Sequence, residues 1–85
     1  MIEMAEAKIG DVVTFVTAER KELPALVTAV FPGAPYGRPD MVNVVFTSED
    51  PNRQDSYGRQ VERATSVPHL SLNQAGGMAW KERTL

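Results

Sequence analysis

With 85 residues, the chain is long enough for one small domain, and its 42% hydrophobic and 24% charged residues are ordinary for such a domain. The absence of cysteine excludes a disulfide framework, a thiolate nucleophile and a zinc–thiolate site. The formal net charge of −2 disfavours bulk binding of nucleic acid, which depends on many cations facing phosphates, but it allows a local basic pocket.

The sequence predicts one domain that does not enter a membrane. No stretch reaches the roughly 18 consecutive apolar residues of a membrane span, and the N-terminus lacks the apolar core of a secretory signal. Residues 1–8 are expected to be a flexible N-terminus, because this run of helix formers is too short to hold a helix alone. Residues 9–85 are expected to form a single small β-barrel domain with a C-terminal tail.

Three apolar runs predict consecutive β-strands. Val12–Thr17 is rich in the β-branched and aromatic side chains that favour strands. Leu23–Phe31 is a second strand, in which Pro24 cannot donate to a ladder and is expected at the strand start or at an edge. Met41–Thr47 is apolar on both faces, which is typical of a strand in the interior of a sheet.

Polar segments separate these runs. Ala18–Glu22 is expected to be an exposed hairpin loop, Pro32–Asp40 a structured loop with three prolines and two glycines, and Ser48–Tyr57 a polar connection. A fourth strand is expected over Arg59–Val67, and Trp80 is expected to close the core from a last short strand. Several short strands without a convincing helix predict an all-β fold, a small antiparallel barrel of about five short strands.

Alternation of side chains along a strand predicts which residues share a face. On the second strand one face is expected to hold Leu23, Ala25, Val27, Ala29 and Phe31. On the fourth strand one face is expected to hold Arg59, Val61, Arg63, Thr65 and Val67. Two arginines on one face repel unless a negative group lies between them. That group would be a ligand phosphate or a carboxylate of a neighbouring chain, Glu62 or Asp55. The alternative is an exposed face on which the arginine stems cover apolar surface.

The tripeptide Tyr-Gly-Arg occurs twice, as Tyr36-Gly37-Arg38 and as Tyr57-Gly58-Arg59. A glycine after the aromatic residue permits a tight turn, so that the ring and the guanidinium can project to one side. A ring that stacks and a guanidinium that binds phosphate through two hydrogen bonds suit a flat anionic ligand. The alternative interpretation is coincidence, because tyrosine and glycine are common in turns.

The remaining candidate ligand-binding residues are the only histidine and the only tryptophan. His69 follows Pro68 in extended backbone and could donate to a phosphate or a ribose; the alternative is a structural histidine with satisfied ring nitrogens. Trp80 could offer a stacking platform or fill the core. The sequence contains no triad pattern, nucleophile elbow or Gly-rich phosphate loop, so it predicts no enzyme, no cofactor and no metal site.

Six short segments of the chain resemble a family of small proteins of actinobacteriophages and prophages. They are the Gly-Asp strand start Gly10–Asp11, the strand Ala25–Val30, the apolar strand Met41–Phe46, the Tyr-Gly-Arg-Gln-Val-Glu-Arg segment Tyr57–Arg63, the Ser-Val-Pro-His step Ser66–His69 and the tail Gly77–Trp80. The resemblance covers most of residues 9–82. It implies a phage origin and a Src-homology-3-like barrel, and it implies no activity.

In a phage setting, these features favour a non-catalytic binding protein in the host cytoplasm. The expected function is a homo-oligomeric sponge that sequesters a phosphorylated nucleotide signal of host antiviral defence, such as a cyclic nucleotide or an ADP-ribose derivative. The expected ligand-binding residues are Tyr36, Arg38, Tyr57, Arg59, Arg63, His69 and Trp80. The alternatives are an interaction or virion-associated module that binds a host or capsid protein, and a nucleic-acid-binding barrel, which the net charge disfavours.

Overall fold

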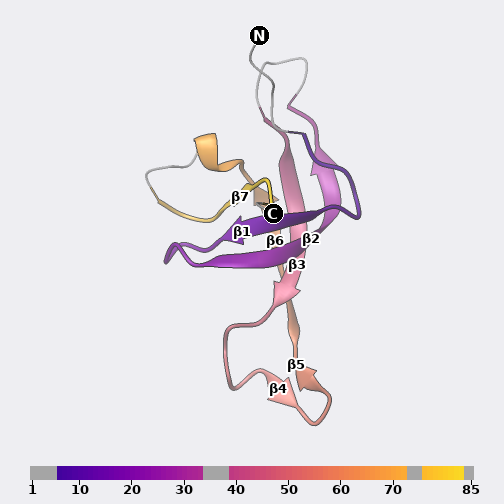
Figure 1. The fold of residues 1–85 in the computed structure, drawn as a ribbon, viewed down its shortest axis with the longest axis vertical. Coiled ribbons are helices and arrows are strands. Elements are labelled where there is room, and N and C mark those ends of the chain that lie inside the picture. The colour runs from indigo at the N-terminus through magenta and orange to yellow at the C-terminus, as the bar shows by residue number, and fades with distance from the viewer. Residues whose placement is uncertain (1–5, 34–38, 73–75, 84–85) are drawn as a thin grey trace.

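The computed structural model describes residues 6–33, 39–72 and 76–83, and the first Tyr-Gly-Arg segment, with Tyr36 and Arg38, lies outside them. The described residues form an all-β fold, as predicted, with one short 3₁₀ turn (Figure 1). The strands are β1 (Val12–Val16), β2 (Glu22–Phe31), β3 (Met41–Thr47), β4 (Gln54–Asp55), β5 (Gly58–Arg59), β6 (Val61–Val67) and β7 (Ala79–Lys81). The 3₁₀ turn, η1 (Leu70–Leu72), follows β6.

Five strands form one antiparallel sheet in the order β6-β3-β2-β1-β7, and β4 pairs with β5 in a separate hairpin. The long strand β2 joins the two halves of the sheet. It pairs with β1 through residues 22–26 and with β3 through residues 26–31, and it turns between the two partners (Figure 1). The predicted third strand matches β3 and has the two neighbours expected of an interior strand, β2 and β6.

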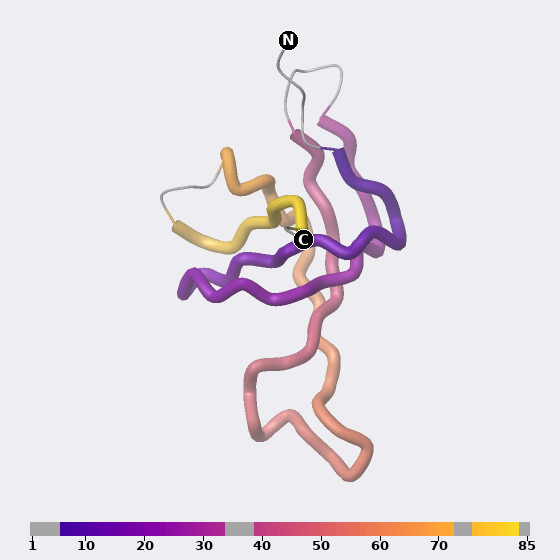
Figure 2. Tube along the Cα trace, viewed as in Figure 1, coloured from indigo at the N-terminus to yellow at the C-terminus, as the bar shows by residue number. Residues whose placement is uncertain are grey.

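The two edges of the sheet meet at one point. After β6, the C=O of Pro68 accepts a hydrogen bond from the N–H of Trp80 at 3.0 Å, and His69 forms an isolated bridge with Trp80 in β7. The sheet therefore curls around its core, whereas β4 and β5 extend away from the body of the molecule (Figure 2). The Src-homology-3-like assignment of this curled sheet stays a prediction.

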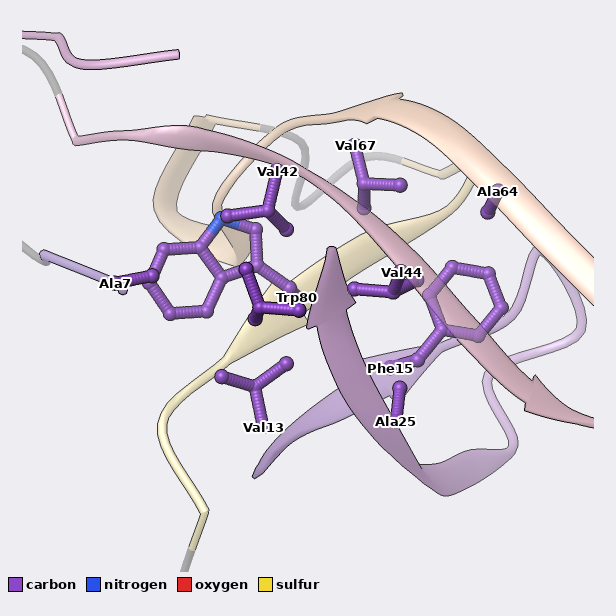
Figure 3. Close-up of a cluster of buried hydrophobic side chains, with 10 residues drawn as sticks. Ala7, Val13, Phe15, Ala25, Val42, Val44, Ala64, Val67 and Trp80 are labelled. Atoms are coloured by element: carbon purple, nitrogen blue, oxygen red, sulfur yellow. The ribbon is translucent and has the colours of Figure 1, made fainter. Parts of the chain in front are cut away.

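The core consists of small side chains, valines and alanines, packed around the rings of Trp80 and Phe15. The largest fully buried hydrophobic side chains are Trp80, Val27, Val42, Val44 and Val67. Figure 3 shows the indole of Trp80 surrounded by Ala7, Val13 and Val42. The rings of Phe15 and Phe46 stack with their centroids 4.6 Å apart. Since a buried aliphatic or aromatic side chain stabilises the fold by about 1.5–3 kcal/mol, this inner face supplies much of the favourable free energy.

Two register shifts flank Asn43 of β3, one towards β2 and one towards β6. The C=O of Asn43 accepts a hydrogen bond from Thr28 Oγ1 at 3.3 Å, and its Oδ1 accepts one from the N–H of Ser66 at 2.8 Å. Ser66 has a φ of 53°, a left-handed conformation that non-glycine residues seldom adopt outside turns and bulges. One asparagine therefore supplies acceptors to the irregular positions of both neighbouring strands.

The register shifts overturn two predicted face assignments. Because one inserted residue moves all later side chains to the opposite face, Phe31 at the end of β2 is exposed, while Val30 packs against the core. In β6, Val67 is fully buried although Arg63, predicted on the same face, is exposed. The predicted fourth strand is also divided, because Gln60 separates β5 from β6, and the predicted polar connection contains β4.

We expect Asn43→Ala to lower the free energy of unfolding by about 1 kcal/mol, because the N–H of Ser66 loses its acceptor. In a domain of this size, the melting temperature should fall by about 4–8 °C. Asn52→Ala is the matched control, since Asn52 lies in an exposed turn where its backbone N–H binds Asp50, and it should change stability by less than about 0.5 kcal/mol. Thermal melts followed by circular dichroism test this prediction, and equal melting temperatures of the two variants would contradict it.

Candidate functional site

β2 and β3 separate beyond the pair Leu26–Val45, and Pro24 explains why. The N–H of Val27 donates to the C=O of Asp11 at 2.9 Å, so the backbone of Val27 faces the β1 side and that of its neighbour Leu26 faces β3. Two residues earlier, Pro24 also faces β3, but it has no N–H to donate. The ladder therefore ends, and Pro24 lies near the start of β2, as predicted.

This separation opens a groove on the outer face of the sheet, opposite the core. The outer groove has a volume of about 280 Å³ and is lined by Val12, Pro24, Ala25, Leu26, Val45, Phe46, Thr47 and Val61. Val12 and Leu26 are exposed, and 61% of the surface of Val61 is open to solvent. Because most of the lining side chains are apolar, the outer groove offers a hydrophobic contact surface.

Arg59 stands at one end of the outer groove. It lines an adjoining hollow of about 160 Å³, which shares Pro24 and Thr47 with the outer groove. Its guanidinium donates to the C=O of Ser48 at 3.1 Å and to Gln54 Oε1 at 3.2 Å. Both acceptors are neutral, so they orient the guanidinium without neutralising its charge.

Arg63 lies beside the outer groove at a second position. It is exposed, and it stands opposite Val45 in the register of β3 and β6. Within residues 6–33, 39–72 and 76–83, the side chain of Arg63 makes no hydrogen bond or ion pair. Since directly opposed side chains share a face, Arg63 lies on the outer face with Val61, as predicted. The outer groove thus has an apolar floor with a cation on either side of Val61.

Tyr57 does not join this surface. It lies in the turn of the β4–β5 hairpin, where its N–H donates to Asp55 Oδ1 at 2.8 Å and Gly58 follows with a φ of 117°. The predicted turn is therefore confirmed, with glycine at the position that needs a positive φ. The tyrosine is 96% exposed and lines neither hollow. Of this Tyr-Gly-Arg segment, only the arginine reaches the groove region.

His69 has a structural environment. Its ring packs edge-on against Trp80 with the centroids 4.7 Å apart, and 14% of its side chain is exposed. Nδ1 lies 2.9 Å from Ser71 Oγ and accepts the N–H of Ser71 at 3.2 Å, while Nε2 lies 3.0 Å from Glu82 Oε1. An accepting Nδ1 places the ring proton on Nε2, towards the carboxylate. Both ring nitrogens therefore have partners, which favours the alternative of a satisfied structural histidine over the predicted role in ligand binding.

The arrangement of Ser71, His69 and Glu82 has the distances of a serine hydrolase triad. Two observations argue against that chemistry. The Nδ1 lone pair is shared with the backbone N–H of Ser71, the geometry of a cap at the start of η1. Ser71 also lines neither of the hollows on the outer face, so no substrate space adjoins its hydroxyl there. We therefore assign the cluster to the closure of the sheet.

Trp80 is part of the core. Its side chain has 0% exposure, and its Nε1 donates to the C=O of Asp40 at 2.9 Å. A stacking platform must present a ring face to a ligand. Trp80 therefore fills the core, which was its alternative role, and this burial disfavours the predicted place of its ring in a ligand site.

A larger hollow of about 380 Å³ lies where both ends of the described chain approach β1. Its lining includes the acidic residues Glu6, Asp11 and Glu82, with Arg83 as the one cation among the lining residues. An excess of carboxylates repels phosphate groups. This hollow therefore does not suit the phosphorylated nucleotide that the sequence analysis expects.

No family model matches the chain, and no similar curated protein or solved structure was found. The resemblance to small phage proteins therefore stays a prediction. Among the described residues, no three His, Asp or Glu side chains gather where they could hold a metal ion. In the same part of the chain, no helix has the length and apolar character needed to cross a membrane.

Sequence reasoning missed the apolar residues that line the outer groove. The missed residues include Val12, Leu26 and Val45, which occupy alternate positions to the core residues of their strands. The sequence contained a signal for them, because a strand with apolar side chains on both faces is usually packed against other residues on both faces. The second apolar face indicates a contact surface as well as a core.

Proposed function

We propose that the protein is a non-catalytic interaction module that binds another protein at the outer groove. One observation carries this proposal: an exposed apolar groove lies on the outer face, and the two arginines beside it form no ion pair with a described residue. Protein interfaces commonly have an apolar centre and are enriched in arginine. Because the lining of the outer groove is mostly apolar and Val12, Leu26 and Val61 are exposed, the groove suits apolar side chains of a protein better than an enclosed phosphorylated ligand.

The partner should present apolar side chains flanked by carboxylates. Apolar side chains would cover Leu26 and Val61, and carboxylates would pair with Arg59 and Arg63. Because the formal net charge of the whole chain is −2, the attraction is local to this face. In the phage setting that the resemblance implies, the partner is a host or capsid protein, met in the host cytoplasm or in the virion.

Sequestration of a phosphorylated nucleotide is the second candidate function, and the two arginines on one outer face favour it. In that case, a homo-oligomer must supply the remainder of the pocket, because Tyr57, His69 and Trp80 do not line the outer groove. Isothermal titration calorimetry with cyclic nucleotides and ADP-ribose derivatives tests this function. Binding heat together with a thermal shift would favour it, and the absence of both would exclude it.

A photo-crosslinking residue placed at Val61 tests the proposed interaction. Extracts of infected host cells and purified virions supply the candidate partners. We expect one protein to crosslink from position 61 and not from position 72, because Leu72 is an exposed apolar residue that does not line the outer groove. The same yield of crosslinks from both positions would indicate nonspecific contact.

Leu26→Asp should weaken binding of the crosslinked partner, once purified, by about tenfold or more, because it places a charge in the apolar centre of the interface. Leu72→Asp makes the same chemical change on η1 and should leave the affinity unchanged. Both leucines are exposed, so both variants should keep melting temperatures close to that of the parent. Calorimetry measures the affinities, and an unaltered affinity of Leu26→Asp would contradict the proposed function.

A further inference from the structure

β6 lies at one end of the strand order, and its outer edge has no strand partner among the described residues. Gln60 reveals which backbone groups face that edge. Its C=O accepts a hydrogen bond from the N–H of Ser48 and its N–H donates to the C=O of Arg53, both at 2.9 Å, so the backbone of Gln60 faces the segment between β3 and β4. Since successive residues of a strand direct their backbone groups to opposite sides, Val61 and Arg63 direct theirs to the open edge.

The open edge covers residues 59–65. Arg59 also precedes Gln60 by one position, so its backbone groups face the edge as well. Ser66, with its positive φ, interrupts the regular ladder, and at Pro68 the sheet edges already meet. Along the open edge, the outer-face side chains follow the order cation, apolar, cation: Arg59, Val61 and Arg63. An unpaired edge supplies main-chain hydrogen bonds to an added strand, and opposed side chains supply specificity.

We propose that the partner adds an extended segment to this open edge, with an apolar residue opposite Val61 and carboxylates opposite Arg59 and Arg63. The segment then has the pattern acidic–any–apolar–any–acidic, which reads the same in both strand directions. This inference rests on the proposed function, because the added strand would lie on the side of β6 that borders the same outer face. It gives the partner protein a sequence pattern by which it can be recognised.

A second copy of the chain fits the open edge less well. If two copies of β6 pair antiparallel with Arg63 at the centre, Arg63 lies opposite Arg63 of the other copy. If Val61 is at the centre, Arg59 of one copy lies opposite Arg63 of the other. Pairing centred on Glu62 sets two glutamates against each other. Like charges directly opposite are destabilising, whereas a segment with two carboxylates neutralises both arginines.

The probe is a short capped peptide with the central sequence Glu-Thr-Val-Thr-Glu, added to the full chain. Ala-Thr-Val-Thr-Ala lacks the carboxylates, and Thr-Glu-Val-Glu-Thr has the same composition with the carboxylates moved to the other face of the strand. We expect the first peptide to bind about tenfold more tightly than the alanine peptide, because it adds two opposite-charge pairs. The shifted peptide should bind less tightly than the first.

Amide hydrogen exchange distinguishes pairing at the edge from binding elsewhere on the outer face. The first peptide should slow exchange at the amides of Val61 and Arg63, and it should not alter exchange at Glu62 and Ala64, which face β3. Arg63→Glu should reduce the preference for the glutamate peptide over Lys-Thr-Val-Thr-Lys by about tenfold. Lys21→Glu makes the same change of charge in the turn before β2 and should leave that preference unchanged.

Equal binding of the first and shifted peptides, or unaltered exchange at Val61 and Arg63, would overturn strand addition. If Leu26→Asp weakens binding of the crosslinked partner while the glutamate peptide does not bind, strand addition fails and the proposed function stands. If Leu26→Asp has no effect on the partner, the proposed function fails. Slow exchange at Val61 and Arg63 in the chain alone, together with a dimer in sedimentation, would assign the edge to a second copy and would also overturn the proposal.

Discussion

Replacing Trp80 with alanine is expected to lower the free energy of unfolding by about 4 kcal/mol, as for other large aromatic residues removed from cores. The indole has no exposed surface and lies among the core side chains of Figure 3. The substitution also removes the donor that binds the C=O of Asp40 at 2.9 Å. A domain of 85 residues has a total stability of about 4–13 kcal/mol, so this loss is a large part of the whole.

Thermal melts followed by circular dichroism should place the melting temperature of Trp80→Ala about 15–30 °C below that of the parent. Trp80→Phe keeps an aromatic ring but removes the N–H that donates to Asp40, so its melting temperature should lie between those of the parent and Trp80→Ala. Leu72→Ala is the control. Because Leu72 is exposed on η1, this substitution should lower the free energy of unfolding by less than about 1 kcal/mol. If Trp80→Ala had the same melting temperature as the parent, the indole could not be in the core, and a ligand-stacking role would regain support.

The strand positions could be predicted because the signal for them is local. Met41–Thr47 is predicted with the bounds of β3, and the first predicted strand extends one residue beyond β1, which ends at Val16. Both runs consist mainly of β-branched and aromatic residues, the types that fit a pleated, half-buried surface, and this enrichment can be seen within each run alone. The expectation for Pro24 is confirmed for the same reason, because a missing N–H limits any ladder in the same way.

The register of the strands could not be predicted, because distant residues determine it. The hydrogen bonds of Asn43 reach Thr28, 15 residues away, and Ser66, 23 residues away. Strict alternation assumes that no residue is inserted, so it failed beyond each shift and assigned Phe31 and Val67 to the wrong faces. No pattern within either strand marks the position of its shift.

The candidate site was only partly predictable for a related reason. The predicted common face of Arg59 and Arg63 is present, since alternation holds from residue 59 to residue 65. Chemical type alone did not separate ligand-binding residues from structural ones: His69 and Trp80 have the same donors in either role, and only their burial and partners decide between them. The outer groove arises where two strands separate, which is a property of the assembled sheet.

Asp40 is a second residue whose role depends on tertiary contacts, and it joins three parts of the fold. Its Oδ2 accepts the N–H of Ala7 at 3.1 Å, and its Oδ1 accepts the N–H of Gly33 at 3.0 Å. Its backbone C=O accepts the indole N–H of Trp80. In the sequence, Asp40 is only the last residue of a predicted loop, yet its carboxylate is buried and connects the chain before β1 to the chain after β2.

Asp40→Ala is therefore expected to lower the free energy of unfolding by about 3 kcal/mol, because two buried N–H groups lose a charged acceptor. The melting temperature should fall by about 10–25 °C. Asp50→Ala is the matched control: Asp50 binds the N–H of Asn52 at 2.9 Å in an exposed turn, where water can replace it, and its loss should cost less than about 1 kcal/mol.

The Asp40→Asn variant tests whether the fold needs both acceptor oxygens of the Asp40 side chain or only one. The amide keeps one oxygen, but its NH₂ group must face one of the two N–H donors, so its stability should lie between those of the parent and Asp40→Ala. Amide exchange should become faster at whichever of Ala7 and Gly33 faces the NH₂ group, and at both in Asp40→Ala. An Asp40→Asn variant as stable as the parent would mean that the carboxylate does not hold both segments at once. The link between the chain before β1 and the chain after β2 would then depend on other contacts.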